Sequence, residues 1–321
     1  MRIISILDTT ICDYNLGNQI IMESVYKILD ELFPDAFIFK LQYGEKFGKL
    51  SLNYIRKSDF TFFGGTNSLS SQMNKYSQMG FRFSDLIFVK NKLILLGVGW
   101  WQYQKKTNLY TRIFLKNLLR EDIFHSVRDS YSKKMLNSIG INNVINTSCP
   151  TTWCLTPEHC QKIPTKKSEN VIITITDYNF QYESEKKLIE TIFPYYKKVF
   201  FWLQGVGDLK LINSLEDIIK KHKDKFYIIP PKLKEYDNIL KNEDIDYIGT
   251  RLHAGIRALQ FGKRTLIVEI DNRAKEISKD INLPTINRGN IDSLMKFITD
   301  GFKIDIKIPE ININKWKSQF K

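Results

Sequence analysis

Short apolar runs alternate with segments of helical periodicity along the whole chain of 321 residues. The apolar runs have the length of strands, and the segments between them place apolar residues at three- and four-residue spacing. This alternation is typical of βα units around a parallel sheet. Before residue 150 it predicts strands at residues 2–7, 36–41, 59–63, 93–96, 123–127 and 144–146, and helices at 18–33, 108–119 and 130–138. After residue 169 it predicts strands at residues 171–176, 199–203, 226–229, 247–249 and 265–269, with helices between and after them.

The pattern breaks between Cys149 and Glu169, where three prolines stand among Thr, Lys and Ser residues. Such a stretch is typical of a linker, and the chain length suits two domains. We therefore expect an N-terminal Rossmann-like domain over residues 1–155 and a C-terminal one over residues 165–305. Residues 306–321 form a tail whose last helix docks back across the linker. The fold class is α/β with two Rossmann-like domains facing across a cleft, so site residues are expected just after strands.

The net charge of +13 changes this picture because it predicts an anionic partner. Nucleic acid, a phosphorylated small molecule and an anionic membrane surface all fit the charge. No signature of a nucleic-acid-binding module is present, so we expect no nucleic acid partner. Arg112, Lys116 and Arg120 recur every four residues on a predicted helix. This basic stripe is either a solvated face or a contact to an anionic membrane.

The longest apolar stretch, residues 93–101, is about half as long as a membrane-spanning helix requires. No targeting segment is recognisable, so we expect a cytoplasmic protein with peripheral contact at the inner membrane face. Cys149, Cys154 and Cys160 stand close to His159, which raises the alternative of a zinc site. Their gaps are longer than those of zinc knuckles, so reduced thiols are favoured and no metal is expected.

The first predicted strand is followed by a turn that contains Asp13, Asn15, Gly17 and Asn18 before a helix begins. Free backbone N–H groups and the positive end of the helix dipole suit a phosphate or carboxylate at such a turn. The alternative is a turn that only reverses the chain. Both interpretations remain open at this point.

Two further strands are followed by residues that suit a ligand. Gly64, Gly65 and Asn67 follow one strand, and paired glycines let a ligand approach the backbone. Neither this segment nor Gly97-Val98-Gly99 matches a dinucleotide or P-loop pattern, so neither cofactor is expected. Trp100 follows Gly99 and is either a stacking surface for a sugar or a core residue.

Arginine and histidine complete the candidate set. Arg128 follows the strand at 123–127 and either binds a carboxylate or phosphate through its planar fork or pairs with Asp129. Arg251 and His253 stand two residues apart where a strand passes into a helix. A guanidinium, a titratable imidazole and a helix N-terminus together predict an anion site with a general acid or base.

The order of these motifs resembles the polysaccharide pyruvyl transferase family over nearly the whole chain. The motifs are Asn15-Leu16-Gly17-Asn18, Gly64-Gly65, Ser126-Val127-Arg128-Asp129 and Thr250-Arg251-Leu252-His253-Ala254 with Gly262 beyond it. Thr66 and Cys149 depart from the pattern, where the family has a glycine and an aspartate. The resemblance implies a fold similar to the GT-B glycosyltransferases. It also implies a reaction in which phosphoenolpyruvate donates a pyruvyl ketal to a sugar.

By the same resemblance, Arg128 and Arg251 hold the phosphate and carboxylate of phosphoenolpyruvate, and His253 is the catalytic acid or base. Arg273 and Lys275 stand where the family carries a basic residue and are further donor-binding candidates. The N-terminal domain is expected on the acceptor side and the C-terminal domain on the phosphoenolpyruvate side. No cofactor is implied beyond phosphoenolpyruvate as co-substrate. The implied acceptor is a galactose or N-acetylhexosamine unit of a capsular polysaccharide or exopolysaccharide, or of its polyprenyl-diphosphate-linked precursor.

Two rival functions remain. A GT-B sugar-nucleotide glycosyltransferase shares the expected architecture, because fold does not fix chemistry. A non-catalytic anion-binding protein of a polysaccharide assembly complex also fits the charge. The first predicts stabilisation by a nucleotide sugar, and the second predicts no effect of His253→Ala.

Overall fold

The computed structural model describes all 321 residues, which fold into two compact units. Unit 1 comprises residues 1–13, 21–153 and 308–321, and unit 2 comprises residues 14–20 and 154–307. Residues 14–20, which the sequence pattern placed in the N-terminal half, thus group with unit 2. The C-terminal tail groups with unit 1. No helix is both long enough and apolar enough to cross a membrane.

Unit 1 is built on a parallel sheet with strand order β2-β1-β3-β4, and β5 pairs with β6 beside it. A bridge between Val98 and Val127 links the chain after β4 to the end of β5. The strands are β1 (Ile3–Asp8), β2 (Phe37–Gln42), β3 (Phe60–Gly64), β4 (Leu93–Leu96), β5 (His125–Val127) and β6 (Val144–Asn146). The helices are α1 (Gly17–Leu32), α2 (Lys49–Lys57), η1 (Phe83–Asp85), α3 (Leu86–Val89), α4 (Leu109–Leu118), α5 (Ser130–Asn137), η2 (Pro150–Thr152) and α14 (Glu310–Ser318).

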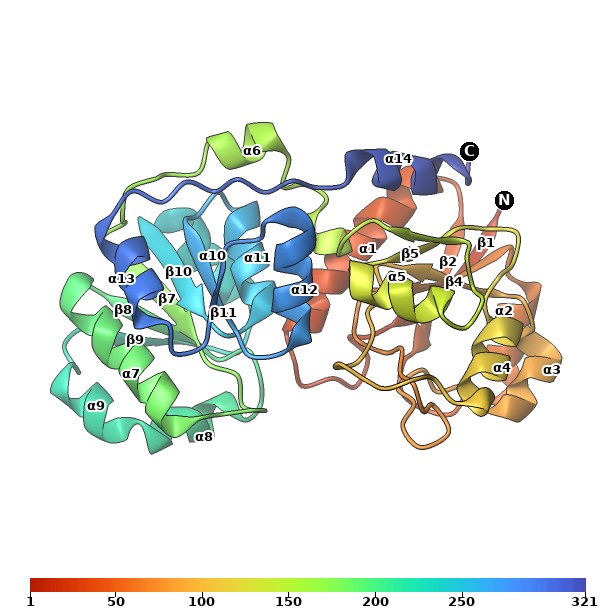
Figure 1. The fold of residues 1–321 in the computed structure, drawn as a ribbon, viewed down its shortest axis with the longest axis horizontal. Coiled ribbons are helices and arrows are strands. Elements are labelled where there is room, and N and C mark those ends of the chain that lie inside the picture. Colours follow the sequence, from red (N-terminus) through yellow and green to blue (C-terminus); the bar gives the residue numbers. More distant parts are fainter. The chain divides into compact units, whose positions relative to one another are not determined.

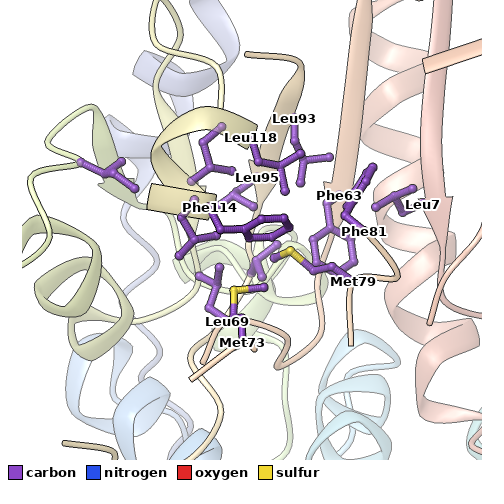
Figure 2. Close-up of a cluster of buried hydrophobic side chains, with 14 of the residues drawn as sticks. Leu7, Phe63, Leu69, Met73, Met79, Phe81, Leu93, Leu95, Phe114 and Leu118 are labelled. Carbon is purple, nitrogen blue, oxygen red and sulfur yellow. The ribbon is translucent and has the colours of Figure 1, made fainter. Parts of the chain in front are cut away.

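Apolar side chains cover both faces of the unit 1 sheet. Helices α1 and α14 pack on one face, where Trp316 is fully buried and lies edge-on to Phe62. Helices α2 to α5 pack on the other face, where Figure 2 shows Phe114 and Leu118 of α4 among the buried side chains. The long connection between β3 and β4 adds Leu69, Met73 and Met79 to this second core. The connection is therefore anchored by its own apolar residues.

Unit 2 is built on six parallel strands in the order β12-β11-β10-β7-β8-β9. The strands are β7 (Asn170–Thr174), β8 (Val199–Trp202), β9 (Phe226–Ile229), β10 (Ile245–Gly249), β11 (Thr265–Glu269) and β12 (Thr285–Asn287). The helices are α6 (Pro157–Gln161), α7 (Tyr182–Ile192), η3 (Phe193–Tyr195), α8 (Asp208–Ser214), α9 (Glu216–Lys221), α10 (Leu233–Asn242), α11 (Leu252–Gln260), α12 (Asn272–Ile281) and α13 (Ile291–Thr299). In the order of the chain, this is the strand arrangement of the Rossmann fold.

Helices cover both faces of the unit 2 sheet (Figure 1). Helices α7, α8, α9 and α13 bury apolar residues on one face. Helices α10 and α11 cover the other, where Tyr236 stacks on Trp202 with ring centroids 4.0 Å apart. Gly255 of α11 allows this helix to approach the sheet, because a Cβ there would lie 2.5 Å from Ile267. The predicted α/β class with parallel sheets is confirmed.

Candidate functional site

The strand order of unit 2 changes direction between the neighbouring strands β7 and β10. β8 and β9 extend the sheet on one side of this pair, and β11 and β12 extend it on the other. Ligands of doubly wound sheets bind beyond the carboxyl ends of the strands at such a switch point. The two strand ends are joined directly, since the Thr250 Oγ1 atom accepts a hydrogen bond of 2.7 Å from the Thr176 N–H. Gly249 permits this contact, because a Cβ there would lie 2.5 Å from Thr174 Oγ1. The residues that follow β7, β8, β10 and β11 build the site.

Arg251 is the N-cap residue of α11 and only 4% of its surface is exposed. One guanidinium nitrogen contacts Asp208 Oδ1 and lies 3.1 Å from Asp177 Oδ1. Asp208 is held in place by the backbone N–H groups of Gln204 and Gly205, each 2.9 Å from Asp208 Oδ2. Burial raises the pKa of the Asp208 carboxyl, and the Arg251 guanidinium opposes that shift. Arg251 is thus fixed before any ligand binds.

A second guanidinium lies close to the first. Both arginines lie near the ring of Tyr178. The guanidinium carbon of Arg251 is 5.9 Å from the ring centroid, and the guanidinium carbon of Arg273 is 5.4 Å from it. Arg273 donates a hydrogen bond to the Tyr178 hydroxyl and is paired with Asp271, the N-cap residue of α12. The structure therefore brings Arg251 and Arg273 together around one aromatic ring. Lys275 is exposed on α12 and makes none of these contacts.

His253 lies in the first turn of α11 and is 8% exposed. Its neighbour across the site is Gly17, at the start of α1. A Cβ on Gly17 would lie 3.6 Å from His253 Cβ and 2.7 Å from Gln204 Nε2. Only glycine fits here without displacing one of these side chains. The sequence prediction that Gly17 belongs with the site residues thus has a packing basis within unit 2.

Asn15 and Gln204 join the start of α1 to the loop after β8. The Leu16 N–H donates to the Gln204 carbonyl at 3.0 Å, and Asn15 forms a bridge with Gly205. The Asn15 Oδ1 atom accepts hydrogen bonds from the Gly17 N–H at 2.9 Å and from Gln204 Nε2 at 2.8 Å. These bonds fix the orientation of the Gln204 amide and leave its buried Oε1 atom without a hydrogen-bond partner. Gln204 therefore offers a free, buried acceptor in the loop after β8.

The remaining N-terminal candidates are Asn18 and Asp13. Asn18 is half-buried in the first turn of α1, and its N–H donates to the Asn15 carbonyl at 3.0 Å. Asp13 is exposed and belongs to unit 1. Of the four candidates in this turn, Asn15 and Gly17 make the described contacts with the loop after β8.

In unit 1 the paired glycines serve a different purpose from the one predicted. A Cβ on Gly64 would lie 2.7 Å from Val25, and one on Gly65 would lie 2.1 Å from Ile21. Gly65 also has a positive φ of 63°. The close approach that these glycines allow is that of helix α1, so the structure corrects their assignment to a ligand.

Arg128 is 1% exposed and lies in unit 1. It donates a hydrogen bond of 2.6 Å to Asn67 Oδ1 and pairs with Asp129 at 3.2 Å. Its guanidinium packs on Gly99, where a Cβ would lie 2.3 Å from the guanidinium carbon. Arg128 thus joins Asn67, through a hydrogen bond, to Asp129, through an ion pair. The ion pair with Asp129 is one of the two roles that the sequence offered for Arg128.

Trp100 was expected either to stack on a sugar or to lie in the core. It is completely buried, and its Nε1 atom donates to Gln104 Oε1 at 2.9 Å. A buried ring has no face to offer a sugar, so this candidate is corrected to a core residue. Its neighbour Trp101 is only half-buried and lies beside Tyr76, with ring centroids 4.5 Å apart.

The cysteines are free thiols, with Cys149 and Cys160 buried and Cys154 exposed. His159 is engaged through Nε2 with the Leu259 carbonyl at 2.7 Å. No group of three or more His, Cys, Asp or Glu side chains is placed to hold a metal ion.

Sequence reasoning missed the residues that support Arg251 and His253, namely Asp177, Tyr178, Gln204, Asp208 and Asp271. Each of them follows the end of a strand, as the candidate residues do. The Gln204-Gly205-Val206-Gly207-Asp208 segment after β8 carried the clearest signal, because two glycines follow a buried strand there.

Comparison with solved structures shows which proteins share this fold. A UDP-N-acetylglucosamine 2-epimerase from Rickettsia bellii matches with a TM-score of 0.54 and 13% identity, covering 99% of this chain and 94% of that chain. A UDP-N-acetylglucosamine 2-epimerase described as putative, from Listeria monocytogenes, matches with a TM-score of 0.51 and 11% identity, covering 93% and 88%. The lipopolysaccharide outer core galactosyltransferase WaaB matches with a TM-score of 0.50 and 9% identity, covering 93% and 90%. At these identities the likeness shows the fold alone, which is that of the GT-B glycosyltransferases and epimerases.

A search of curated proteins found no significant match. The family model of polysaccharide pyruvyl transferases, in contrast, matches residues 15–272. The match begins at Asn15 and ends at Asn272, and so includes Gly17, Arg251 and His253 of the unit 2 site. Because the match covers well over half of the chain, the protein belongs to the polysaccharide pyruvyl transferase family.

Proposed function

We propose that this enzyme transfers the pyruvyl group of phosphoenolpyruvate to a sugar, forms a cyclic pyruvate ketal and releases phosphate. The observation that carries the proposal is the grouping of Arg251, Arg273 and His253 at the switch point of unit 2. Two guanidinium groups suit the two anionic groups of phosphoenolpyruvate, its carboxylate and its phosphate. The first turn of α11 adds the positive end of a helix dipole.

The two carboxylates on Arg251 have different roles in this proposal. Asp208 is completely buried, so it holds Arg251 in place throughout the reaction. The Asp177 side chain is 34% exposed and lies on the same nitrogen. Hydration stabilises a carboxylate that leaves an ion pair at such an exposed position. We propose that the donor's anionic group replaces Asp177 on Arg251.

His253 exchanges the proton in the chemical step. The methylene carbon of the enol takes up one proton, and the adjacent carbon becomes an oxocarbenium-like centre. Two sugar hydroxyls add to that centre, and its bond to the phosphate oxygen breaks. One hydroxyl proton passes to His253 and replaces the proton that His253 gave to the methylene carbon. The other hydroxyl proton leaves with phosphate. A positioned imidazole serves both proton transfers, while the arginines offset the charge of the leaving phosphate.

Gln204 is the proposed contact for the acceptor. Its buried Oε1 atom has no hydrogen-bond partner, and a sugar hydroxyl is a donor that satisfies it. The acceptor is a galactose or N-acetylhexosamine unit of a capsular polysaccharide or exopolysaccharide, or of its polyprenyl-diphosphate-linked precursor. Lys275 and Arg128 stay predicted donor-binding residues. For Arg128, binding requires that Asn67 or Asp129 give up its bond.

The test is phosphate release from phosphoenolpyruvate with galactosyl and N-acetylhexosaminyl acceptors, free and lipid-diphosphate-linked. We expect acceptor-dependent release that falls by roughly 10²–10⁴-fold in His253→Ala, the range for loss of a general acid or base. His222→Ala is the matched control, because His222 lies in unit 2 and stacks on Phe193 outside the site. Stabilisation by a nucleotide sugar, with no release from phosphoenolpyruvate, would instead establish a glycosyltransferase. Equal activity of His253→Ala and wild type would refute the role of His253.

A further inference from the structure

Most of the net positive charge of the chain comes from one stretch of unit 1. Residues 44–120 contain thirteen Lys and Arg and three Asp and Glu, a net charge of +10 out of the total of +13. This stretch includes α2, η1, α3 and α4. The unit 2 site holds none of these residues, so the proposed donor chemistry does not account for the charge.

The same stretch exposes apolar side chains that the core does not use. We define the apolar patch as Phe83, Ile87, Phe88, Leu109 and Ile113. Ile87 is 83% exposed and Leu109 is 68% exposed, and the other three are between 41% and 47% exposed. Their elements are η1, α3 and α4, and α3 and α4 are in contact (Figure 1). The ring of Phe83 also lies 5.3 Å from that of Tyr110 on α4, so the elements that carry the patch adjoin one another.

The patch is the outer side of elements whose inner side already fills the core. In α3, Leu86 and Val89 are buried, and Ile87 and Phe88 between them are exposed. In α4, Phe114, Leu115 and Leu118 are buried against the sheet. Leu109 and Ile113 stand four residues apart and so share the outer face. Single exposed apolar residues are ordinary, but a group of this size on adjoining elements marks an interaction surface.

Basic side chains surround the apolar patch. Lys90 directly follows α3, Lys105 and Lys106 precede α4, and Lys116 lies on α4. All four are exposed and none forms a salt bridge within the protein. Arg112 is half-buried, and Arg120 is paired with Asp122, so the stripe seen in the sequence contributes mainly through Lys116.

We infer that this surface docks on an anionic phospholipid bilayer. Apolar side chains flanked by unpaired lysines match the boundary between acyl chains and acidic headgroups, where each has a favourable partner. Nucleic acid has no comparable use for five exposed apolar side chains. A second copy of the chain would bring the same positive charge to the contact and repel it.

The inference is tested by flotation of the full-length protein with phosphatidylcholine vesicles, with and without phosphatidylglycerol. Wild type is expected to float with the anionic vesicles at low salt, to bind neutral vesicles weakly, and to dissociate as salt rises. Ile87→Glu is expected to lower the partition coefficient by at least tenfold. It removes an apolar side chain that the bilayer would bury, and it adds a negative charge that anionic headgroups repel. Ile311→Glu is the matched control, because Ile311 on α14 is 85% exposed and lies outside the patch.

The lysines provide a second variant. Lys105→Glu with Lys106→Glu is expected to weaken binding to anionic vesicles by about fivefold or more for each residue. Thermal melting verifies that each variant is folded. Phosphate release with a water-soluble acceptor is expected to stay unchanged in Ile87→Glu, so failure of vesicle binding and failure of the proposed reaction are separate results.

Three results would overturn the inference. The first is no binding of wild type to anionic vesicles, or equal binding to neutral ones. The second is wild-type affinity in Ile87→Glu. The third is self-association of wild type that Ile87→Glu abolishes without any effect on vesicles, because the patch is then an interface between copies of the chain.

Discussion

Replacement of Arg251 by methionine tests how much the buried ion pair between Arg251 and Asp208 stabilises unit 2. The variant leaves Asp208 completely buried, with its Oδ2 atom still bonded to the N–H groups of Gln204 and Gly205 but with no cation at Oδ1. Removal of one partner from a buried ion pair costs about 3–5 kcal/mol, because the remaining charge is uncompensated. In a unit of this size each kcal/mol lowers the melting temperature by roughly 2–4 °C. We therefore expect Arg251→Met to melt about 6–20 °C below wild type near pH 8.

The destabilisation has a pH dependence whose sign follows from the carboxyl group. Burial raises the pKa of Asp208 in the folded protein, and loss of Arg251 removes the main opposing influence. A carboxyl whose pKa is raised on folding favours the folded state at low pH and disfavours it as the unfolded form ionises. The difference between Arg251→Met and wild type should therefore shrink towards pH 4 and grow towards pH 8.

The assay is thermal and urea unfolding of both proteins from pH 4 to pH 8. The control is the double variant Arg251→Met with Asp208→Asn, in which an amide oxygen still accepts from the N–H groups of Gln204 and Gly205. The double variant removes both charges, so it should recover most of the lost stability. A loss below about 1 kcal/mol at pH 8 in the single variant would refute the reasoning. So would a double variant that is no more stable than Arg251→Met.

Three further predictions concern other groups. His125 is fully buried, and burial lowers its pKa to about 4, so it stays neutral when folded. The unfolding free energy of wild type relative to His125→Gln should fall by up to about 3 kcal/mol as pH drops from 6.5 to 4, measured in urea; equal pH profiles would contradict this. Burial raises the pKa of Glu185 to about 7, so wild type should lose up to about 3 kcal/mol relative to Glu185→Gln as pH rises from 4.5 to 7. A constant difference across that range would show that Glu185 ionises normally. Asp177→Asn weakens the group that competes with the donor for Arg251, so steady-state kinetics should give a KM for phosphoenolpyruvate that is several-fold lower. A higher KM would show that Asp177 helps to bind the donor.

The periodicity of the sequence predicted the strands well where they are buried on both faces. β7, for example, consists of buried residues throughout, and its Val- and Ile-rich run predicted it. β10 is also buried throughout, but the prediction covered only residues 247–249 of it. The pattern missed β12 (Thr285–Asn287), which has three residues and no fully buried side chain. It also missed α3, whose four residues are too few to show helical periodicity. Short elements of this kind depend on tertiary packing, which no local pattern records.

The rule that site residues follow strands selected Arg251 and His253 as candidates, but it could not supply their partners. Thr176 and Thr250 are hydrogen-bonded although 74 positions separate them in the sequence. The same strand order places Asp177 and Asp208 beside Arg251. The order of strands in a sheet is a tertiary property, so the sequence alone predicted an arginine at a strand end without its ion pairs.

The glycines show a second limit of sequence reasoning. From the sequence, Gly17 was a candidate because a turn before a helix N-terminus presents free N–H groups, and Gly64 was one because a missing Cβ permits close approach. At Gly17 the approaching groups are Gln204 and His253 of the site, whereas at Gly64 the approaching group is Val25 of α1. A glycine therefore predicts that something lies close to the backbone, and only the fold decides whether it is a ligand or a helix.

The two carboxylates on Arg251 connect the stability of unit 2 to its proposed chemistry. An arginine with Asp208 alone keeps its place but presents a nearly neutral pair to an incoming anion. An arginine with neither carboxylate would be a buried free cation, which is costly. In the proposed reaction Asp177, one-third exposed, covers the guanidinium nitrogen until the donor's anion takes its place on the Arg251–Asp208 pair, and Asp177 is then hydrated. Because that pair is nearly neutral, the proposal needs a second guanidinium for a donor with two anionic groups. Arg273 is the proposed group, since it is 19% exposed, pairs with Asp271 and shares Tyr178 with Arg251.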